Sequence, residues 1–280
     1  MDLVQDAWAC ADEAAGRVDV CVAELSRPAD LEDASVLLQR VWRAGHPAEV
    51  AAASLLRTYA HSGNYVAGAY RDGHLIGVAA GFFGLPHGHP HLHSYVAGVS
   101  PGRLGKGVGF ALKQHQRAWT LARGVPEVHW TYDPLILRNA YFNLQKLGAA
   151  VTGYLPEFYG AMADGINSGD LSDRLYVVWR LDAPRVAAAA HGSPAEVSTE
   201  GAVPLVAAGP DGAPVESTVD ADRVCVAVPE DAEAVRQRDP ATALRWRHAV
   251  RTALSGRLAA GWRIDGITRD GRYVLERSGG

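Results

Sequence analysis

The residues best suited to chemistry lie between His93 and Gly109, in the segment HSYVAGVSPGRLGKGVG. A hydrophobic strand pattern there ends in a glycine-rich turn, and a helical pattern follows directly. Gly105, Gly107 and Gly109 allow backbone conformations that other residues adopt only at a cost. Their amide hydrogens, at the positive end of a helix dipole, are suited to an anion. The segment is therefore typical of a phosphate-binding turn, and a ligand that carries a pyrophosphate is its natural occupant.

This turn differs from the two most familiar phosphate-binding motifs. It has neither the lysine and hydroxyl residue of a Walker loop nor the GxGxxG spacing of a dinucleotide fingerprint. A glycine-rich helix entry without a ligand is therefore an alternative interpretation of the segment taken alone.

Histidines precede the turn, in the loop GLPHGHPHLH at residues 84–93. His93 begins the predicted strand, and an imidazole titrates near neutral pH without special tuning, so His93 is a candidate proton acceptor. A hydrogen bond within the sheet, or an exposed loop position, is an equally weighted alternative. No carboxylate or cysteine completes a metal-ligand set with His87, His89 and His91, so we expect no metal there.

The three cysteines, Cys10, Cys21 and Cys225, are odd in number and lie far apart. They have no CxxC spacing of the kind that binds zinc or forms a redox pair. We expect buried or idle thiols.

The composition limits the class of protein. A length of 280 residues suits one large domain or two modest ones. With 48% hydrophobic and 21% charged residues, the chain can form a hydrophobic core. The formal net charge of −4 argues against a nucleic-acid surface spread over the fold. No apolar run reaches membrane-spanning length, and the N-terminus lacks the blocks of a signal peptide. We expect a cytoplasmic protein with no nucleic-acid or membrane partner.

The elements that must position the turn follow from the residue pattern. Asp72 and Gly73 form the dipeptide best suited to a tight primed turn between two strands. The predicted elements before the turn are a strand at 18–26, helices at 30–44 and 48–61, and strands at 64–71, 74–83 and 93–99.

A helix at 107–123 and a strand at 127–133 follow the turn, and His115 on the apolar face of that helix is predicted to pack in the core. Strand, turn, helix and strand form a βαβ unit. Parallel pairing of 93–99 with 127–133 would put the glycine turn at the carboxyl ends of the strands, where open sheets bind ligands.

The remaining pattern predicts a C-terminal extension. Residues 1–183 form the first predicted domain, 184–219 a linker or peripheral segment rich in Ala, Pro, Gly and Ser, and 220–280 a smaller α/β block. The later predicted elements are a helix at 138–148 closed by Gly148, strands at 150–155, 173–181 and 220–229, a helix at 240–260, and a hairpin of 261–267 with 272–277.

This order of elements resembles the GNAT superfamily of N-acetyltransferases. The superfamily's pyrophosphate motif, [QR]xxGxG with G or A last, aligns with residues 104–109. The glycines match, while Leu104 stands at the first position and Arg103 lies one place earlier. The side-chain part of the motif is therefore altered, and backbone amides carry the expected phosphate contacts.

More closely, the chain is similar to a branch marked by LHS, GxG, WTxDPL, RNAxFNxxKLG and DRLxVxW. These motifs stand here at 92–94, in the glycine turn, and at 130–135, 138–148 and 173–179. The resemblance covers about residues 18–181 and implies an α/β fold with a mixed central sheet flanked by helices.

The resemblance implies binding of acyl-coenzyme A, such as acetyl-CoA or succinyl-CoA, with pantetheine between two splayed strands. A backbone amide near Gly98 or Val99 would hold the acyl carbonyl. The acceptor would be the amine of a small molecule or amino acid. The residues expected at the cofactor are Gly98, Val99, Arg103, Leu104, Gly105, Lys106, Gly107, Val108 and Gly109.

Acylation of an amine needs a proton acceptor, for which His93 is the candidate, and a proton donor for the departing thiolate. The family's usual tyrosine position is Leu144 here, so Tyr141, one turn earlier, is the candidate donor. Asp133 is a third candidate catalytic residue. The candidate substrate-binding residues are Asn143, Arg138 and Arg174, of which the two arginines could grip a carboxylate or pair with local acids.

Two further functions stay open at this stage, because the usual tyrosine is absent. One is an acyl-CoA enzyme with other chemistry, such as a decarboxylase or O-acyltransferase. The other is a non-catalytic acyl-CoA sensor. The C-terminal block could cover the site, contact the acceptor or form a homodimer.

Overall fold

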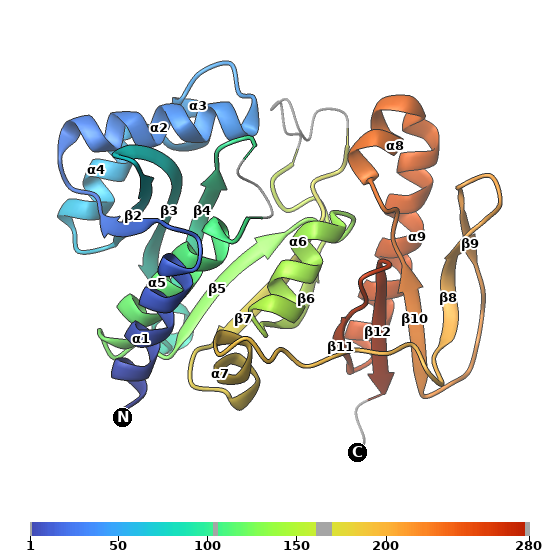
Figure 1. Ribbon diagram of the computed structural model, residues 1–280. Coiled ribbons are helices and arrows are strands. Elements are labelled where there is room, and N and C mark those ends of the chain that lie inside the picture. The colour runs from blue at the N-terminus through green and yellow to red at the C-terminus, as the bar shows by residue number, and fades with distance from the viewer. Residues whose placement is uncertain (1, 103–105, 161–169, 278–280) are drawn as a thin grey trace. The chain divides into compact units, whose positions relative to one another are not determined.

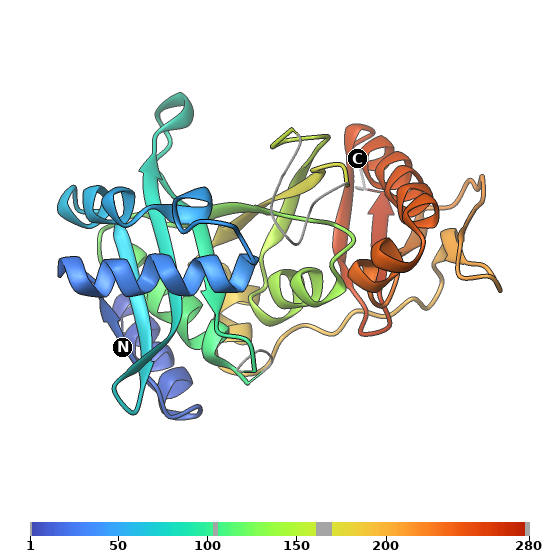
Figure 2. The same ribbon diagram turned by 90° about the horizontal axis from the view of Figure 1, so that it is seen from above.

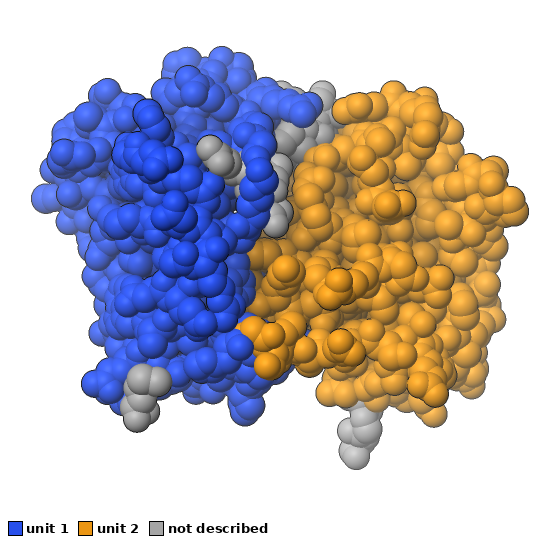
Figure 3. Space-filling model, viewed as in Figure 1, with its two compact units in different colours: residues 1–130, 164–166, 180–191 blue, residues 131–163, 167–179, 192–280 orange. Residues whose placement is uncertain are grey.

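The computed structural model describes residues 2–102, 106–160 and 170–277 (Figure 1). The chain divides into two compact units, shown in Figure 3. Unit 1 comprises residues 1–130, 164–166 and 180–191, and unit 2 comprises residues 131–163, 167–179 and 192–280. None of the helices in the described ranges combines the length and apolar character needed to cross a bilayer.

Unit 1 is built on a mixed sheet whose strands lie in the order β1-β2-β3-β4-β5. Its strands are β1 (Cys21–Glu24), β2 (Tyr65–Arg71), β3 (His74–Gly84), β4 (His91–Val99) and β5 (Glu127–Tyr132), the last of which belongs to this unit up to Trp130. Neighbours pair antiparallel from β1 to β4, whereas β4 and β5 pair parallel.

Helices cover both faces of this sheet, and Figure 2 shows α2 lying across its strands. Val78 of β3 belongs to the core formed with α2 and α4, whereas a side chain at the neighbouring Gly77 would meet Val108 and Leu112 of α5. Successive residues of a strand point to opposite faces, so α5 packs on the face opposite α2. The helices of this unit are α1 (Leu3–Gly16), α2 (Pro28–Trp42), α3 (Ala48–Ala51), α4 (Ala53–His61), the short 3-10 helix η1 (Pro86–Gly88), α5 (Val108–Leu121) and α7 (Pro184–Ala190).

The predicted hairpin is confirmed. Arg71 pairs with His74, and the two residues between them both have positive φ, 51° at Asp72 and 74° at Gly73. This is the geometry of a type I′ turn, which matches the twist of the flanking strands.

The predicted βαβ unit is confirmed as well. Leu92 pairs with Val128 and His93 with His129 in parallel register, and α5 connects the two strands. Within β4 the pairing with β3 shifts register between Ser94 and Val96, which leaves Tyr95 as an extra residue. This β-bulge was not anticipated from the sequence.

The structure contains one helix for which no prediction was made and divides one predicted helix in two. The N-terminal residues form α1, whose start has a capping box in which the Gln5 N–H donates to the Asp2 carboxylate at 2.8 Å. The sequence DLVQ at residues 2–5 carries that capping signal. The helix predicted at 48–61 is broken at Ala52 into α3 and α4, because the Ala51 carbonyl accepts the Ser35 hydroxyl instead of continuing a helical ladder.

Unit 2 contains a strand pair and a separate sheet. The strands β6 (Ala150–Leu155) and β7 (Arg174–Arg180) pair antiparallel, after a helix α6 (Leu137–Tyr141) that continues as the π-helix η2 (Phe142–Lys146). The second sheet has the order β11-β12-β10-β8-β9. Its strands and helices are β8 (Val203–Ala208), β9 (Pro214–Glu216), β10 (Arg223–Ala227), α8 (Ala232–Arg238), α9 (Pro240–Ala259), β11 (Trp262–Ile267) and β12 (Arg272–Arg277).

The segment expected as a linker, residues 184–219, contains α7, β8 and β9. Val203 of β8 pairs in parallel with Val224 of β10, so β8 is part of the C-terminal sheet. Of the residues in β8, Leu205 and Val206 are buried, and this run is too short to give a periodic signal. The domain limits at 183 and 220 stay predictions.

Candidate active site

The glycine turn connects the end of β4 to the start of α5. Val99 ends the strand, and Gly107 stands at the N-cap of the helix with a φ of 89°. The predicted cofactor residues Arg103, Leu104 and Gly105 lie outside the described residues.

Glycine is required at position 107 for two reasons. A positive φ strains any residue with a Cβ. A Cβ built there would also come within 2.7 Å of Val18 Cγ1. The absence of a side chain at Gly107 therefore lets the backbone lie close to Val18 at the point where α5 begins.

The first turn of α5 has the features of an anion site. Gly107 makes no side-chain cap, and the first turn contains no acidic residue. The Val108 and Gly109 N–H groups have no partner within the helix, because the first helical bond joins Ala111 N to Gly107 O. Lys106, just before the cap, is exposed. The start of α5 thus combines backbone donors with a helix dipole, and an exposed lysine lies one residue before it in the sequence.

Gly98 and Val99 lie in the β3–β4 ladder, where they pair with Val78 and Gly77. A Cβ at Gly98 would come within 2.7 Å of the Trp42 ring. Close packing of α2 on β4 therefore accounts for this glycine. The opposite edge of β4 pairs with β5 at Leu92 and His93, and within the described residues no ladder pair to β5 follows along β4.

His93 lies in a cluster of basic side chains. The rings of His91 and His129 stack at 4.0 Å, and Nε2 of His129 lies 2.8 Å from Oε2 of Glu127. Burial, together with the charges of His91, His129 and Lys113, lowers the pKa of His93 to about 4. His93 is therefore neutral at pH 7 and is a weaker base than a solvated imidazole.

Lys113 on α5 is the chemically notable residue that the sequence analysis missed. Its Nζ donates to Ser94 Oγ at 3.2 Å and Gln116 Oε1 at 2.5 Å, and lies 3.9 Å from the centre of the Trp130 ring. The residue is 4% exposed, and this burial lowers the pKa of its amine to about 7. Near neutral pH, Lys113 is therefore partly neutral and able to exchange a proton. The sequence around it, LKQHQR, is polar and gives no sign that this lysine is buried.

His115, on the same helix, packs as predicted. The residue is buried, and its Nδ1 lies 3.0 Å from the hydroxyl of Tyr65. Burial lowers the pKa of His115, so its ring is a neutral part of the core.

In unit 2, Asp133 is held by a buried arginine. Arg247 Nη1 and Nη2 donate to the two Asp133 oxygens at 2.6 and 2.8 Å, and the Leu135 N–H donates to Oδ1 at 2.9 Å. Arg247 also donates to Asp170, which pairs with Arg236 at 2.7 Å. The carboxylate predicted to be catalytic thus lies in an ionic network that fixes the end of β5.

Asp173 forms a second network. It accepts from the Tyr154 hydroxyl at 2.6 Å, the Glu157 N–H at 3.1 Å and Nε of Arg251 at 2.8 Å. Burial alone would raise the pKa of Asp173, but the bonds from Arg251 and Tyr154 outweigh it and lower that pKa. Asp173 of the DRLxVxW motif is therefore an ionised structural group.

The other unit 2 candidates occupy separate places. Arg138 forms a two-bond ion pair with Glu233 at 2.8 and 2.9 Å. Nη1 of Arg174 donates to the Asp173 carbonyl, and the Arg174 guanidinium lies 5.1 Å from the Tyr159 ring. The remaining positions are Tyr141, half-buried with its ring 5.8 Å from the Arg269 guanidinium, and Asn143 and Leu144, both buried in η2.

The predicted site residues therefore fall into two groups. Unit 1 carries His93, Gly98, Val99, Lys106, Gly107, Val108 and Gly109, which β4, the turn and α5 bring together along one connection. Unit 2 carries Asp133, Arg138, Tyr141, Asn143 and Arg174. Within unit 2, Asp133 and Arg138 are bound in ion pairs to helices of the C-terminal block.

Part of the chain matches a known family model. Residues 31–142 match the model of the Acetyltransferase (GNAT) family. A search among curated proteins found no match to the chain.

Solved structures similar to this chain include three bacterial proteins. A GNAT-family acetyltransferase from Streptococcus pneumoniae is 14% identical, with 57% of this chain and 98% of that one covered and a TM-score of 0.47. The ribosomal-protein-S18-alanine N-acetyltransferase from Escherichia coli is 15% identical, with 59% and 95% covered and a TM-score of 0.47. A putative acetyltransferase from Salmonella typhimurium, solved with acetyl-CoA, is 16% identical, with 59% and 95% covered and a TM-score of 0.47.

Proposed function

We propose that the chain, whose residues 31–142 match the model of the Acetyltransferase (GNAT) family, transfers an acyl group from acyl-CoA to the amine of a small molecule or an amino acid. CoA-dependent acyl transfer is the general activity of the family, and its fold, a mixed sheet flanked by helices, is the one described above. The acyl group, acetyl or succinyl-like, and the class of acceptor belong to the proposal. The observation that carries it is the start of α5, which has no side-chain cap and follows β4 through the glycine turn.

The residues at this start suit a pyrophosphate. The N–H groups of Val108 and Gly109 have no helical partner, no acidic side chain lies in the first turn, and Lys106 supplies a nearby positive charge. We propose that these groups, with Arg103, Leu104 and Gly105, bind the CoA pyrophosphate.

The open edge of β4 suits the pantetheine and acyl end of the same ligand. After His93 this edge makes no described ladder pair with β5, and the bulge at Tyr95 interrupts the regular register next to it. Bulges of this kind often lie beside active sites, where they redirect backbone groups. We propose that a backbone amide of this strand, near Gly98 or Val99, holds the thioester carbonyl oxygen.

In the proposed reaction the amine nitrogen attacks the thioester carbonyl carbon, the carbon–sulfur bond breaks, and the CoA thiolate takes up a proton. His93 is neutral at pH 7 and accepts the proton that the amine loses. Tyr141 is the proposed donor to the thiolate and Asp133 a further catalytic group. Asn143, Arg138 and Arg174 are the proposed contacts of the acceptor.

The first experiment is calorimetric titration with acetyl-, succinyl- and malonyl-CoA, followed by mass spectrometry of each complex incubated with pooled amines and with L- and D-amino acids. Tight binding and an acylated amine would support the proposal. Absence of binding to any acyl-CoA would overturn it.

A matched pair of variants tests the binding site. Gly107→Ala puts a Cβ at a φ of 89° and against Val18, whereas Gly73→Ala puts one at a φ of 74° in a hairpin turn with open space around it. We expect acyl-CoA binding at least tenfold weaker in Gly107→Ala and unchanged in Gly73→Ala. Equal affinities in both would place the ligand elsewhere.

A second candidate function, acyl-CoA binding without turnover, is favoured by Leu144, which is 2% exposed at the position where the resemblance expects a tyrosine. Tight binding without any product would support that function. Carbon dioxide released from malonyl-CoA would instead support decarboxylation.

A further inference from the structure

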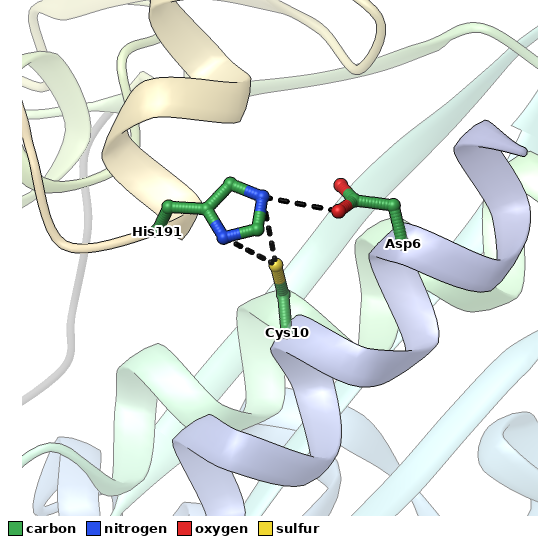
Figure 4. A group of neighbouring side chains, drawn as sticks. All are labelled: Asp6, Cys10 and His191. Atoms are coloured by element: carbon green, nitrogen blue, oxygen red, sulfur yellow. Dashed lines mark hydrogen bonds and ion pairs between the residues drawn. The ribbon is translucent and has the colours of Figure 1, made fainter. Parts of the chain in front are cut away.

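A cluster of potential metal ligands lies in unit 1, on parts of the chain that the proposed acyl transfer does not use. Asp6 and Cys10 are four residues apart on α1, so their side chains lie on one face of that helix. His191 directly follows α7 and points toward both (Figure 4). Cys10 and His191 are 181 residues apart in the sequence, and the fold brings them together.

The spacing of the three side chains suits a tetrahedral metal ion. Both ring nitrogens of His191 lie 3.8 Å from Cys10 Sγ, and Nε2 lies 3.0 Å from Asp6 Oδ1. One ligand atom from each residue falls within 4.8 Å of the other two. Zinc bonds of about 2.3 Å to sulfur and 2.1 Å to nitrogen or oxygen put tetrahedral ligand atoms roughly 3.3 to 3.6 Å apart. The cluster therefore needs small movements to surround such an ion.

A buried arginine beside the cluster is a second, independent observation. Arg117 of α5 is fully buried and donates from Nε to the Leu181 carbonyl at 3.1 Å. Its terminal nitrogens, Nη1 and Nη2, have no hydrogen-bond partner among the described residues. Its charge interacts with Cys10 and Asp6. The charge of Arg117 favours the thiolate form of Cys10, which is the form that binds a metal, and it partly offsets burial and Asp6, which raise the pKa of that thiol.

We propose that Asp6, Cys10 and His191 bind a zinc ion, with water as the fourth ligand. Zinc is the ion that accepts thiolate, imidazole and carboxylate together, in tetrahedral geometry. The His191 side chain is 52% exposed, which leaves the outer side of the site open to a water ligand. On binding, the Cys10 thiol releases its proton to solvent, and neutral His191 coordinates through one ring nitrogen.

The role of this ion is structural. It cross-links α1 to the segment that follows α7, and both belong to unit 1. Such a link stabilises the folded unit because zinc binds the assembled ligands and not the separated ones.

The experiment uses the full chain, purified without a polyhistidine tag, stripped with a chelator and titrated with cobalt(II) as a spectroscopic substitute for zinc. We expect one equivalent to bind with a thiolate-to-cobalt charge-transfer band and tetrahedral visible bands, and zinc to displace them. Zinc is also expected to raise the melting temperature of the stripped protein.

Variants assign the ligands. We expect Cys10→Ser to abolish the charge-transfer band, and His191→Gln and Asp6→Asn each to weaken binding at least tenfold. Cys21→Ser, which removes an exposed cysteine outside the cluster, is the matched control and should bind as the wild type does. His191 is on the surface, so His191→Gln tests the site even where Cys10→Ser fails to fold. Binding below a fifth of an equivalent, no charge-transfer band, or an unaltered affinity in His191→Gln would overturn the proposal.

Discussion

Each unit buries a cationic side chain on a helix, and the two cations are held in opposite ways. Arg247 of α9, in unit 2, is 0% exposed and lies between the carboxylates of Asp133 and Asp170. Lys113 of α5, in unit 1, is 4% exposed and contacts a hydroxyl, an amide and the face of Trp130. Burial alone would lower the pKa of each. For Arg247 the two ion pairs outweigh burial and raise the pKa, whereas burial lowers the pKa of Lys113 to about 7.

The opposite pKa shifts of Arg247 and Lys113 indicate different roles, a permanent charge for Arg247 and a titratable one for Lys113. Arg247 keeps its proton at any physiological pH and fixes the segment that begins with the WTxDPL motif. Lys113 changes charge close to neutral pH, beside Ser94 on the strand that we propose for acyl-CoA. Titratable groups with strongly shifted pKa values gather at functional sites, so the comparison adds Lys113 to the groups whose protonation merits measurement.

The largest effect is expected from Arg247→Met. Removing Arg247 leaves the buried Asp133 carboxylate without its cationic partner, while Asp170 keeps its ion pair with Arg236, and costs about 3 to 5 kcal/mol of unfolding free energy. Chemical denaturation measures it, and Arg245→Met, at an exposed position of α9, is the control. A loss below about 1 kcal/mol would show that this network does not hold unit 2 together.

Lys113→Met is expected to act in the opposite direction. The unfolded chain keeps a proton on this amine up to about pH 10.4, and the folded chain keeps it up to about pH 7. Between these values wild-type stability rises with pH, because the unfolded state binds more protons. The variant lacks this dependence, so at pH 6 it should be more stable than wild type by on the order of 2 to 4 kcal/mol, and this gain should shrink toward pH 10.

Unfolding curves at pH 6, 8 and 9.5 measure this change, with Lys106→Met, at an exposed position, as the control. A pH-independent difference between Lys113→Met and wild type would mean that Lys113 keeps an ordinary pKa. The contrast between the two buried cations would then disappear.

A smaller loss is expected from Tyr154→Phe. The variant removes the hydroxyl that donates to buried Asp173 at 2.6 Å and leaves the ring in place. The carboxylate keeps its bonds from Arg251 and the Glu157 N–H, so we expect a loss of about 1 to 2 kcal/mol. Thermal unfolding measures it, and Tyr159→Phe, whose ring is 50% exposed, is the control. Equal losses in both would show that Asp173 does not need the Tyr154 bond.

The smallest effect is expected from Arg138→Ala. The side chains of this ion pair are 58% exposed at Arg138 and 28% at Glu233, so water competes for both charges. We expect a change within about 0.5 kcal/mol, measured by the same unfolding curves. If Arg138 also binds the acceptor, as proposed, the variant raises the KM for the acceptor while the affinity for acyl-CoA stays unchanged. A loss of several kcal/mol of unfolding free energy would instead show that the ion pair of Arg138 stabilises the fold as strongly as that of Arg247.

Local preferences made parts of this fold predictable. Asp72 and Gly73 favour a primed turn whatever surrounds them, and the strand pairs of the hairpin follow from that turn. The helix at α5 and the glycine at position 107 were likewise encoded within a few residues. The break at Ala52 was not, because it depends on Ser35, which another helix brings close.

The strand, turn and helix that begin the proposed acyl-CoA site are encoded locally, because φ preferences and hydrophobic periodicity act between near neighbours. Tertiary structure decided which charged groups are structural and which can titrate. Asp133 meets Arg247 across 114 residues, and Cys10 meets His191 across 181. Contacts between residues so far apart in the sequence depend on the fold of the whole unit. The burial that lowers the pKa of Lys113 likewise exists only in the folded state.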